Sequence, residues 1–136
     1  DYIVIDKTGV GQGVFDRLKQ MDYPVRGIAF GEKAEDEMFA NLKAELHWRQ
    51  RKWLLSGGRL IQDYGWNEFE VVKYKNKDGK IAIQPKEELL REGIASPNVV
   101  DAAVLTQCIK DSAIRSARMM KGNNQFQDKM LDVWRG

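Results

Sequence analysis

Short apolar runs and one amphipathic segment make up the first thirty residues. Residues 2–5 are aromatic or β-branched, which predicts a buried strand that ends at Asp6. Residues 14–21 carry apolar side chains at helical spacing, and residues 25–30 form a second strand-like run. A strand, a helix and a strand in this order predict two parallel strands joined by a right-handed crossover.

The middle of the chain predicts one long helix followed by two short strands. Apolar side chains recur near one face of residues 35–55, and two glycines follow, as they often do where a helix ends. Strand-like runs at residues 69–75 and 80–84 flank the pair Asp78 and Gly79. Because Asp-Gly favours the tight turn of a β-hairpin, we expect these two strands to pair.

Two further helices are predicted near the end of the chain. Pro85 begins a short helix that runs to about residue 92. Ser96 and Pro97 begin the last main helix, because serine caps free backbone amides and proline suits the first helical position. Residues 107–136 are expected to form a C-terminal helical extension, packed on the core or docked on a partner.

Composition limits the classes of protein and of site. The 136 residues suit one domain, and no apolar run is long enough for a membrane-spanning helix. The net charge of +2 is too small to identify a partner. One cysteine, Cys108, and one histidine, His47, exclude a disulfide framework within the chain, a cysteine-based zinc cluster and a multi-histidine metal site. We expect Cys108 in the core and His47 on a helix surface.

A glycine-rich turn follows the first predicted strand. Gly9, Gly11 and Gly13 alternate with other residues, and the spacing matches neither a dinucleotide-binding fingerprint nor a P-loop. Phosphate binding is one interpretation of this segment. A tight connection from strand to helix is the interpretation that we favour.

Two acidic residues are candidates for chemistry. Asp6 follows a predicted strand, and ligand sites in open α/β sheets lie outside the carboxyl ends of the strands. Asp101 lies among small apolar residues on a predicted helix, where an unpaired charge is costly unless a basic group or a metal ion accompanies it. The alternative interpretations are a turn cap for Asp6 and an exposed residue near a helix N-terminus for Asp101. With a third acid, the pair would suit two Mg²⁺ or Mn²⁺ ions.

Lysines on the predicted hairpin and the following helix are candidates for DNA binding. They can contact a phosphate backbone without regard to base sequence. Lysines on exposed strands also protect sheet edges from aggregation, which is the alternative. The candidate DNA-binding residues are Lys73, Lys75, Lys80 and Lys86.

Five stretches of the sequence, taken in order, form a pattern that matches a known family. They are residues 3–11 (IVIDKTGVG), 25–31 (VRGIAFG), 41–48 (NLKAELHW), 79–81 (GKI) with the later Lys86, and 96–102 (SPNVVDA). By their order and spacing over about residues 2–106, these stretches resemble the nuclease domain of the large terminase subunit of tailed bacteriophages, the DNA-packaging motor. Asn98 departs from the pattern, since the family often has Asp there.

The resemblance implies an α/β fold of the ribonuclease H-like type, a mixed sheet flanked by helices with an added β-hairpin. Residues 1–106 would form the nuclease domain, and residues 107–136 the extension. The resemblance places catalytic, metal-binding carboxylates at Asp6 and Asp101, with a third acid on a strand before Asp1. The first residue is not methionine. We therefore expect that the chain is a piece of a longer protein and lacks its N-terminal strands.

The resemblance also implies a function and partners. The activity would be cleavage of concatemeric double-stranded DNA with two Mg²⁺ or Mn²⁺ ions, in the cytoplasm of a bacterial host. The partners would be DNA, the ATPase domain of the parent chain, the small terminase subunit and the portal protein, with no membrane. Two alternatives stay open: another ribonuclease H-like nuclease of the resolvase or transposase type, and a non-catalytic module that binds DNA or the portal.

Overall fold

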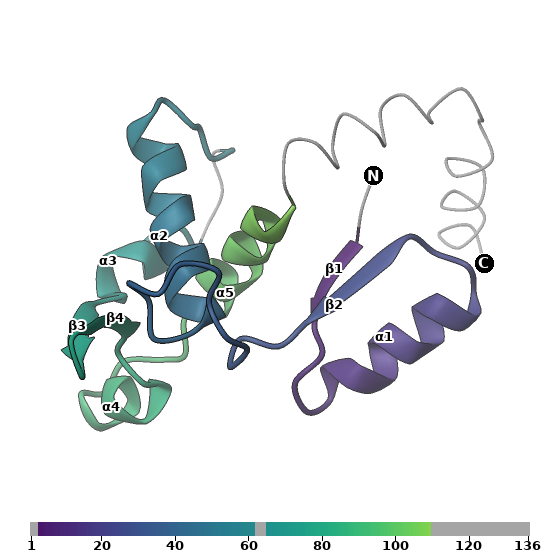
Figure 1. Cartoon of the computed structure of the whole chain (residues 1–136), viewed down its shortest axis with the longest axis horizontal. Helices are drawn as coiled ribbons and strands as arrows, with labels where there is room; N and C mark the ends of the chain where they lie inside the picture. The colour runs from purple at the N-terminus through teal and green to yellow at the C-terminus, as the bar shows by residue number, and fades with distance from the viewer. Residues whose placement is uncertain (1–2, 62–64, 110–136) are drawn as a thin grey trace.

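The computed structural model describes residues 3–61 and 65–109 of the chain. Helices and strands are interspersed along these residues, giving a mixed α/β structure with one small parallel sheet and one small antiparallel sheet in the described part of the chain. In Figure 1 the parallel strands lie between the first helix and a group formed by the later helices and the antiparallel pair. No helix in the described part of the chain is both long and apolar enough to span a membrane.

The N-terminal unit consists of β1 (Ile3–Asp6), α1 (Gly11–Gln20) and β2 (Val25–Ile28). The strands pair in parallel, with Asp6 opposite Ile28, so the predicted strand–helix–strand unit is confirmed. Side chains alternate between the two faces of a strand. Ile5 lies near the start of α1, whereas Val4 packs into the main core on the other face. Asp6 therefore shares the face of Val4, away from α1.

The glycine-rich segment is a tight connection between β1 and α1. Gly9 has a φ of 61°, a left-handed conformation that glycine adopts without steric cost. Gly11 is the first residue of α1, and a Cβ atom there would overlap the carbonyl oxygen of Asp6. The helix can approach the end of the strand this closely only because Gly11 has no side chain.

The long helix α2 (Leu42–Leu55) begins later than the sequence predicts. Residues 38–40 instead run beside the strand β4 (Lys80–Ile83), where the Ala40 amide donates to the carbonyl oxygen of Ile81. Asn41 is extended, and its side-chain oxygen accepts a hydrogen bond from the Ala44 amide, 3.0 Å away. This cap and the pairing with β4 override the helical pattern of residues 35–41.

The antiparallel sheet is formed by β3 (Tyr74–Lys77) and β4 (Lys80–Ile83). Both turn residues between them have left-handed φ values, 53° at Asp78 and 79° at Gly79. This is the turn geometry that an Asp-Gly pair favours between antiparallel strands.

The strand predicted over residues 69–75 is wrong for its first half, which forms the short helix α3 (Glu68–Val71). Phe69 and Val72 both pack against the main core. Residues three apart share a face of a helix but lie on opposite faces of a strand, so packing of both side chains on one core favours the helical turn.

Two helices complete the described chain, α4 (Lys86–Arg91) and α5 (Asn98–Leu105), and a 3₁₀ turn at Thr106–Cys108 follows α5. The predicted cap by Ser96 is wrong, because its hydroxyl contacts the side chain of Asn98 rather than a free amide. Glu68 caps α5 instead. Helix α5 ends at Leu105, and most of the extension predicted over residues 107–136 lies outside the described residues, from residue 110 onward.

The core lies where α5 and α2 meet the parallel strands. Its buried members are Ile28, Leu46, Val100, Val104 and Cys108, so the predicted burial of Cys108 is confirmed. A smaller cluster of Ala34, Phe39 and Ala44 joins α2 to Ile81 and Ile83 of β4. These two clusters fix α2 and α5 against each other and against both sheets.

Candidate active site

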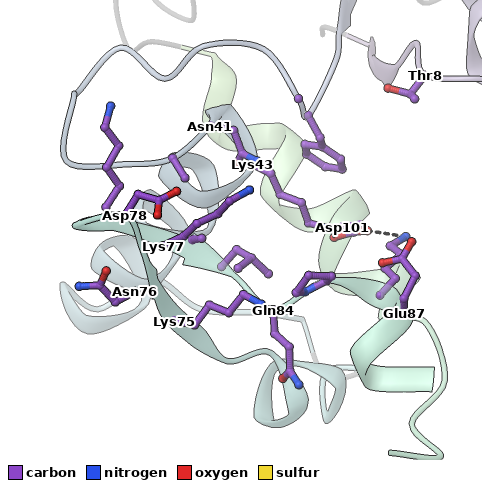
Figure 2. Close-up of a pocket in the computed structure, with 18 of the residues that line it drawn as sticks. Thr8, Asn41, Lys43, Lys75, Asn76, Lys77, Asp78, Gln84, Glu87 and Asp101 are labelled. Atoms are coloured by element: carbon purple, nitrogen blue, oxygen red, sulfur yellow. Dashed lines mark hydrogen bonds and ion pairs between the residues drawn. The ribbon is translucent and has the colours of Figure 1, made fainter. Parts of the chain in front are cut away.

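A surface groove of about 970 Å³ brings together residues from both sheets and three helices. It lies between the carboxyl ends of the parallel strands and the β3–β4 turn, and Figure 2 shows lysines and acids around it. Five lysines and four acids line it, so its charge is mixed. The charged lining residues are Asp6, Lys43, Lys75, Lys77, Asp78, Lys80, Lys86, Glu87 and Asp101.

Asp6 lies at the carboxyl end of β1 and lines this groove, as its position in the sequence predicts. One of its oxygens, Oδ1, accepts a hydrogen bond from the Thr8 amide, 3.0 Å away. Asp6 therefore caps the turn, as the alternative interpretation predicts, and its carboxylate also lines the groove. The turn holds the carboxylate in place beside the rigid end of the strand.

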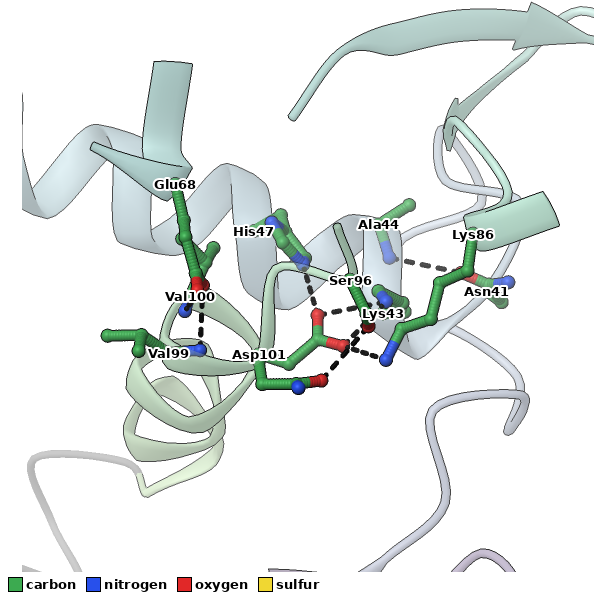
Figure 3. Close-up of polar contacts among 11 residues, drawn as sticks. Asn41, Lys43, Ala44, His47, Glu68, Lys86, Ser96, Val99, Val100 and Asp101 are labelled. Carbon is green, nitrogen blue, oxygen red and sulfur yellow. Dashed lines mark hydrogen bonds and ion pairs between the residues drawn. The ribbon is translucent and has the colours of Figure 1, made fainter. Parts of the chain in front are cut away.

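Asp101 lines the same groove from the first turn of α5, and its side chain is 11% exposed. Lys43 Nζ lies 2.9 Å from its Oδ1 and 3.1 Å from its Oδ2. Lys86 Nζ lies 2.8 Å from Oδ2, and His47 Nε2 lies 3.5 Å from Oδ1 (Figure 3). The basic partner that a buried acid requires is thus provided by two lysines from two helices.

The surroundings shift the pKa values of Asp101 and His47. Burial favours the protonated form of Asp101, but the interactions of its carboxylate with His47, Lys86 and Lys43 outweigh burial and lower the pKa of Asp101 well below its usual range. Burial also lowers the pKa of His47, against the raising effect of its interaction with Asp101. At neutral pH the site therefore holds a carboxylate anion at Asp101 beside a neutral imidazole at His47.

Lys43 and His47 were missed as site residues by sequence reasoning, and the prediction of His47 on a helix surface is wrong. Both lie on α2, four residues apart and therefore on one face of the helix. The one feature of the sequence that could have indicated them is the spacing of these two basic side chains near the capped N-terminus of a helix. Nothing in the sequence places that face against Asp101, which is 58 residues from Lys43.

Three of the four lysines predicted to contact DNA line the groove, namely Lys75, Lys80 and Lys86. Lys73 is not among the lining residues and pairs with Glu92, 3.5 Å away. Lys75 donates to Glu88 at 2.6 Å, whereas Lys80 and its cross-strand neighbour Lys77 have no ion pair with any described residue. Lys77 and Lys80 are therefore the groove lysines most available to an anionic ligand.

Asp6 and Asp101 supply oxygen ligands of the kind that Mg²⁺ and Mn²⁺ prefer. Asp101 Oδ1 is buried and lacks a hydrogen bond of good geometry to the described residues. Within residues 3–61 and 65–109, however, no three His, Cys, Asp or Glu side chains group closely enough to hold an ion. The two carboxylates are thus of the kind that binds these ions, but the described residues do not supply a complete set of metal ligands.

No family model matches the chain, and no curated protein does. Solved structures do match. The nuclease domain of the large terminase subunit gp2 of bacterial virus Sf6 superposes with a TM-score of 0.62 at 18% identity, over 79% of this chain and 64% of that one. A mutant of that domain solved with manganese gives a TM-score of 0.65 at 18% identity, over 79% and 65% of the two chains. The same mutant has also been solved with calcium.

The chain thus spans less than two thirds of the length of these solved domains. At this level of identity the likeness concerns the fold. It agrees with the family to which the sequence motifs point, and we conclude that the described chain has the fold of a terminase nuclease domain.

Proposed function

We propose that this chain is part of the nuclease domain of a terminase large subunit and hydrolyses phosphodiester bonds of double-stranded DNA with Mg²⁺ or Mn²⁺. In this proposal the fold is ribonuclease H-like, and β3 and β4 form its added hairpin. The observation that carries the proposal is the groove lined by Asp6 and Asp101 together. The fold likeness to nuclease domains, one of them solved with manganese, supports it.

The acids and the lysines of the groove have separate roles. Asp6 and Asp101 would hold the metal ions, completed by an acid outside the described residues. Bound ions supply a water molecule of lowered pKa and stabilise the leaving oxygen. Lys86, at the start of α4, orients the Asp101 carboxylate through its 2.8 Å contact with Oδ2. Because that side chain is 42% exposed, it would also be open to contact with a substrate phosphate.

The β3–β4 turn would hold the DNA backbone. Lys77 and Lys80 face each other across the turn and line the groove. Lys75 and Lys86 lie farther along the same groove, where each also pairs with an acid. Such contacts position the duplex but carry no base information, so cleavage would be largely independent of sequence.

The biological setting is proposed from the same likeness. The chain would act with the ATPase domain of its parent protein, the small terminase subunit and the portal protein. It would cut concatemeric DNA during genome packaging in the cytoplasm of the bacterial host.

Cleavage of a supercoiled plasmid by the full parent chain with Mn²⁺ tests the proposal. Asp6→Asn and Asp101→Asn should each abolish nicking, and chelation of the metal should do the same. Asp16→Asn is a matched control, because Asp16 is exposed on α1 and outside the groove. If both groove variants still cut at the rate of the control, the proposal is wrong.

A non-catalytic DNA-binding module is the second candidate. The pairing of Asp101 with Lys43 and Lys86 favours it, because ammonium groups already neutralise the carboxylate. In that case the parent chain would bind duplex DNA without cutting it. Asp101→Asn would then lower the thermal stability and leave no cleavage to lose.

A further inference from the structure

His47 is the least exposed group that contacts Asp101. Its side chain is 3% exposed, against 17% for Lys43 and 42% for Lys86. It lies one helical turn beyond Lys43 on α2, and Figure 3 shows its ring directed toward the Asp101 carboxylate. A short, buried ring has far fewer accessible positions than a partly exposed lysine chain.

Lys43 contacts both oxygens of Asp101, and each oxygen has one further neighbour of its own. Oδ1 is buried, with His47 Nε2 at 3.5 Å and Lys43 Nζ at 2.9 Å. Oδ2 contacts Lys86, which comes from the rim of the groove. Neither His47 Nε2 nor Oδ1 has a hydrogen bond of good geometry within the described chain, although they face each other. Two facing buried polar atoms are stabilised when the distance between them shortens.

We propose that His47 is a positioning residue for Asp101, which donates from Nε2 to Oδ1 and so keeps Oδ2 turned toward the groove. The inference rests on the proposed nuclease function. His47 does not reach the groove itself, since it is absent from the groove lining.

The lysines alone would not hold the carboxylate during turnover. Lys43 and Lys86 both line the groove, where the phosphates of a bound DNA compete for their ammonium groups. His47 is shielded from that competition by its burial. It therefore fixes the rotation of the carboxylate whether or not DNA occupies the groove.

Two variants of matched size, made in the full parent chain, test whether the N–H group of His47 is what positions Asp101. Glutamine and methionine have similar length and volume, but only glutamine has an N–H group near the position of Nε2. With Mn²⁺ and plasmid DNA, His47→Met should lower kcat about 10-fold or more, the effect typical of lost partners of metal-binding side chains. KM for DNA should change less than about twofold, and His47→Gln should cut several-fold faster than His47→Met.

Three outcomes overturn the inference: His47→Met cuts as fast as the unmodified chain, the two variants are slowed equally, or only KM changes. If His47→Met does not fold, His47→Phe replaces it, since phenylalanine fills the ring volume without a donor. Asp101→Asn is measured in the same assay. If it is inactive while His47→Met is fully active, only the inference fails. If Asp101→Asn cuts normally, the proposed function fails and the inference with it.

Discussion

The carboxylate of Glu68 accepts a hydrogen bond from the backbone amide of Val99, 2.7 Å from Oε2, although the two residues are 31 positions apart. The same oxygen accepts a second hydrogen bond from the amide of Val100. Glu68 thus caps the N-terminus of the helix that carries Asp101, in the place where a local serine cap was expected. A negative charge at this end of a helix is also favoured by the helix dipole.

Loss of this cap should destabilise the fold. Glu68→Ala is expected to lower the free energy of unfolding by about 1 kcal/mol, the usual effect of removing a helix cap. Glu68→Gln keeps one acceptor oxygen and should lower it less. Urea denaturation measures both, with Glu70→Ala as the control, because Glu70 is exposed on the same helix and is not a capping residue. Equal losses for Glu68→Ala and Glu70→Ala would contradict this role.

The glycines of the first connection should respond in opposite directions to alanine. Gly11→Ala places a methyl group against the Asp6 carbonyl oxygen and should lower the free energy of unfolding by about 1–3 kcal/mol. Gly13→Ala meets no atom within 4 Å and should raise it by about 0.5–1 kcal/mol, since alanine favours helix. Thermal denaturation of the two variants checks the sign. Two changes of the same sign would argue against the close approach of α1 to β1.

Asp101 should make stability depend on acid pH. Its pKa is lowered in the folded chain, whereas the unfolded value is about 3.9. The stabilisation is therefore present above the unfolded pKa and is lost as the pH falls through the folded pKa. Between about pH 5 and pH 2, the unmodified chain should lose more stability than Asp101→Asn. Urea midpoints at several pH values give the comparison, and parallel curves for the two proteins would contradict it.

Lys77 and Lys80 should contribute to DNA binding, and Lys73 should not. Alanine at either groove lysine is expected to weaken duplex binding and to reduce the slope of log affinity against log salt by about 1. Lys73→Ala is the matched control, because Lys73 lies outside the groove lining and pairs with Glu92. Fluorescence anisotropy with a labelled duplex at several salt concentrations measures the slopes. If Lys73→Ala weakens duplex binding as much as Lys80→Ala does, the DNA binds outside the groove.

The parts of the fold that depend on local pattern could be predicted from the sequence. The parallel pair follows from two apolar runs and one amphipathic helix, and the β3–β4 turn follows from Asp78 and Gly79. The start of α2 could not be predicted in the same way. Residues 38–40 have a helical pattern but pair with β4, which lies about forty positions later in the chain.

The sequence singles out the two acids that line the groove, but it does not reveal the residues around them. Asp6 could be identified by its place after a strand, and Asp101 by its charge among apolar residues. The partners of Asp101 come from α2 and α4, so they depend on how three helices pack. The burial of His47 likewise follows from packing of α2 against α5, which the sequence of α2 does not specify.

The central claim is that Asp6 and Asp101 hold the same divalent cations. The most direct test is anomalous scattering from crystals of the parent chain grown with Mn²⁺. We expect manganese density in contact with both carboxylates, inside the groove between β1 and α5. Manganese that binds elsewhere, or that contacts neither of these two acids, would contradict the account.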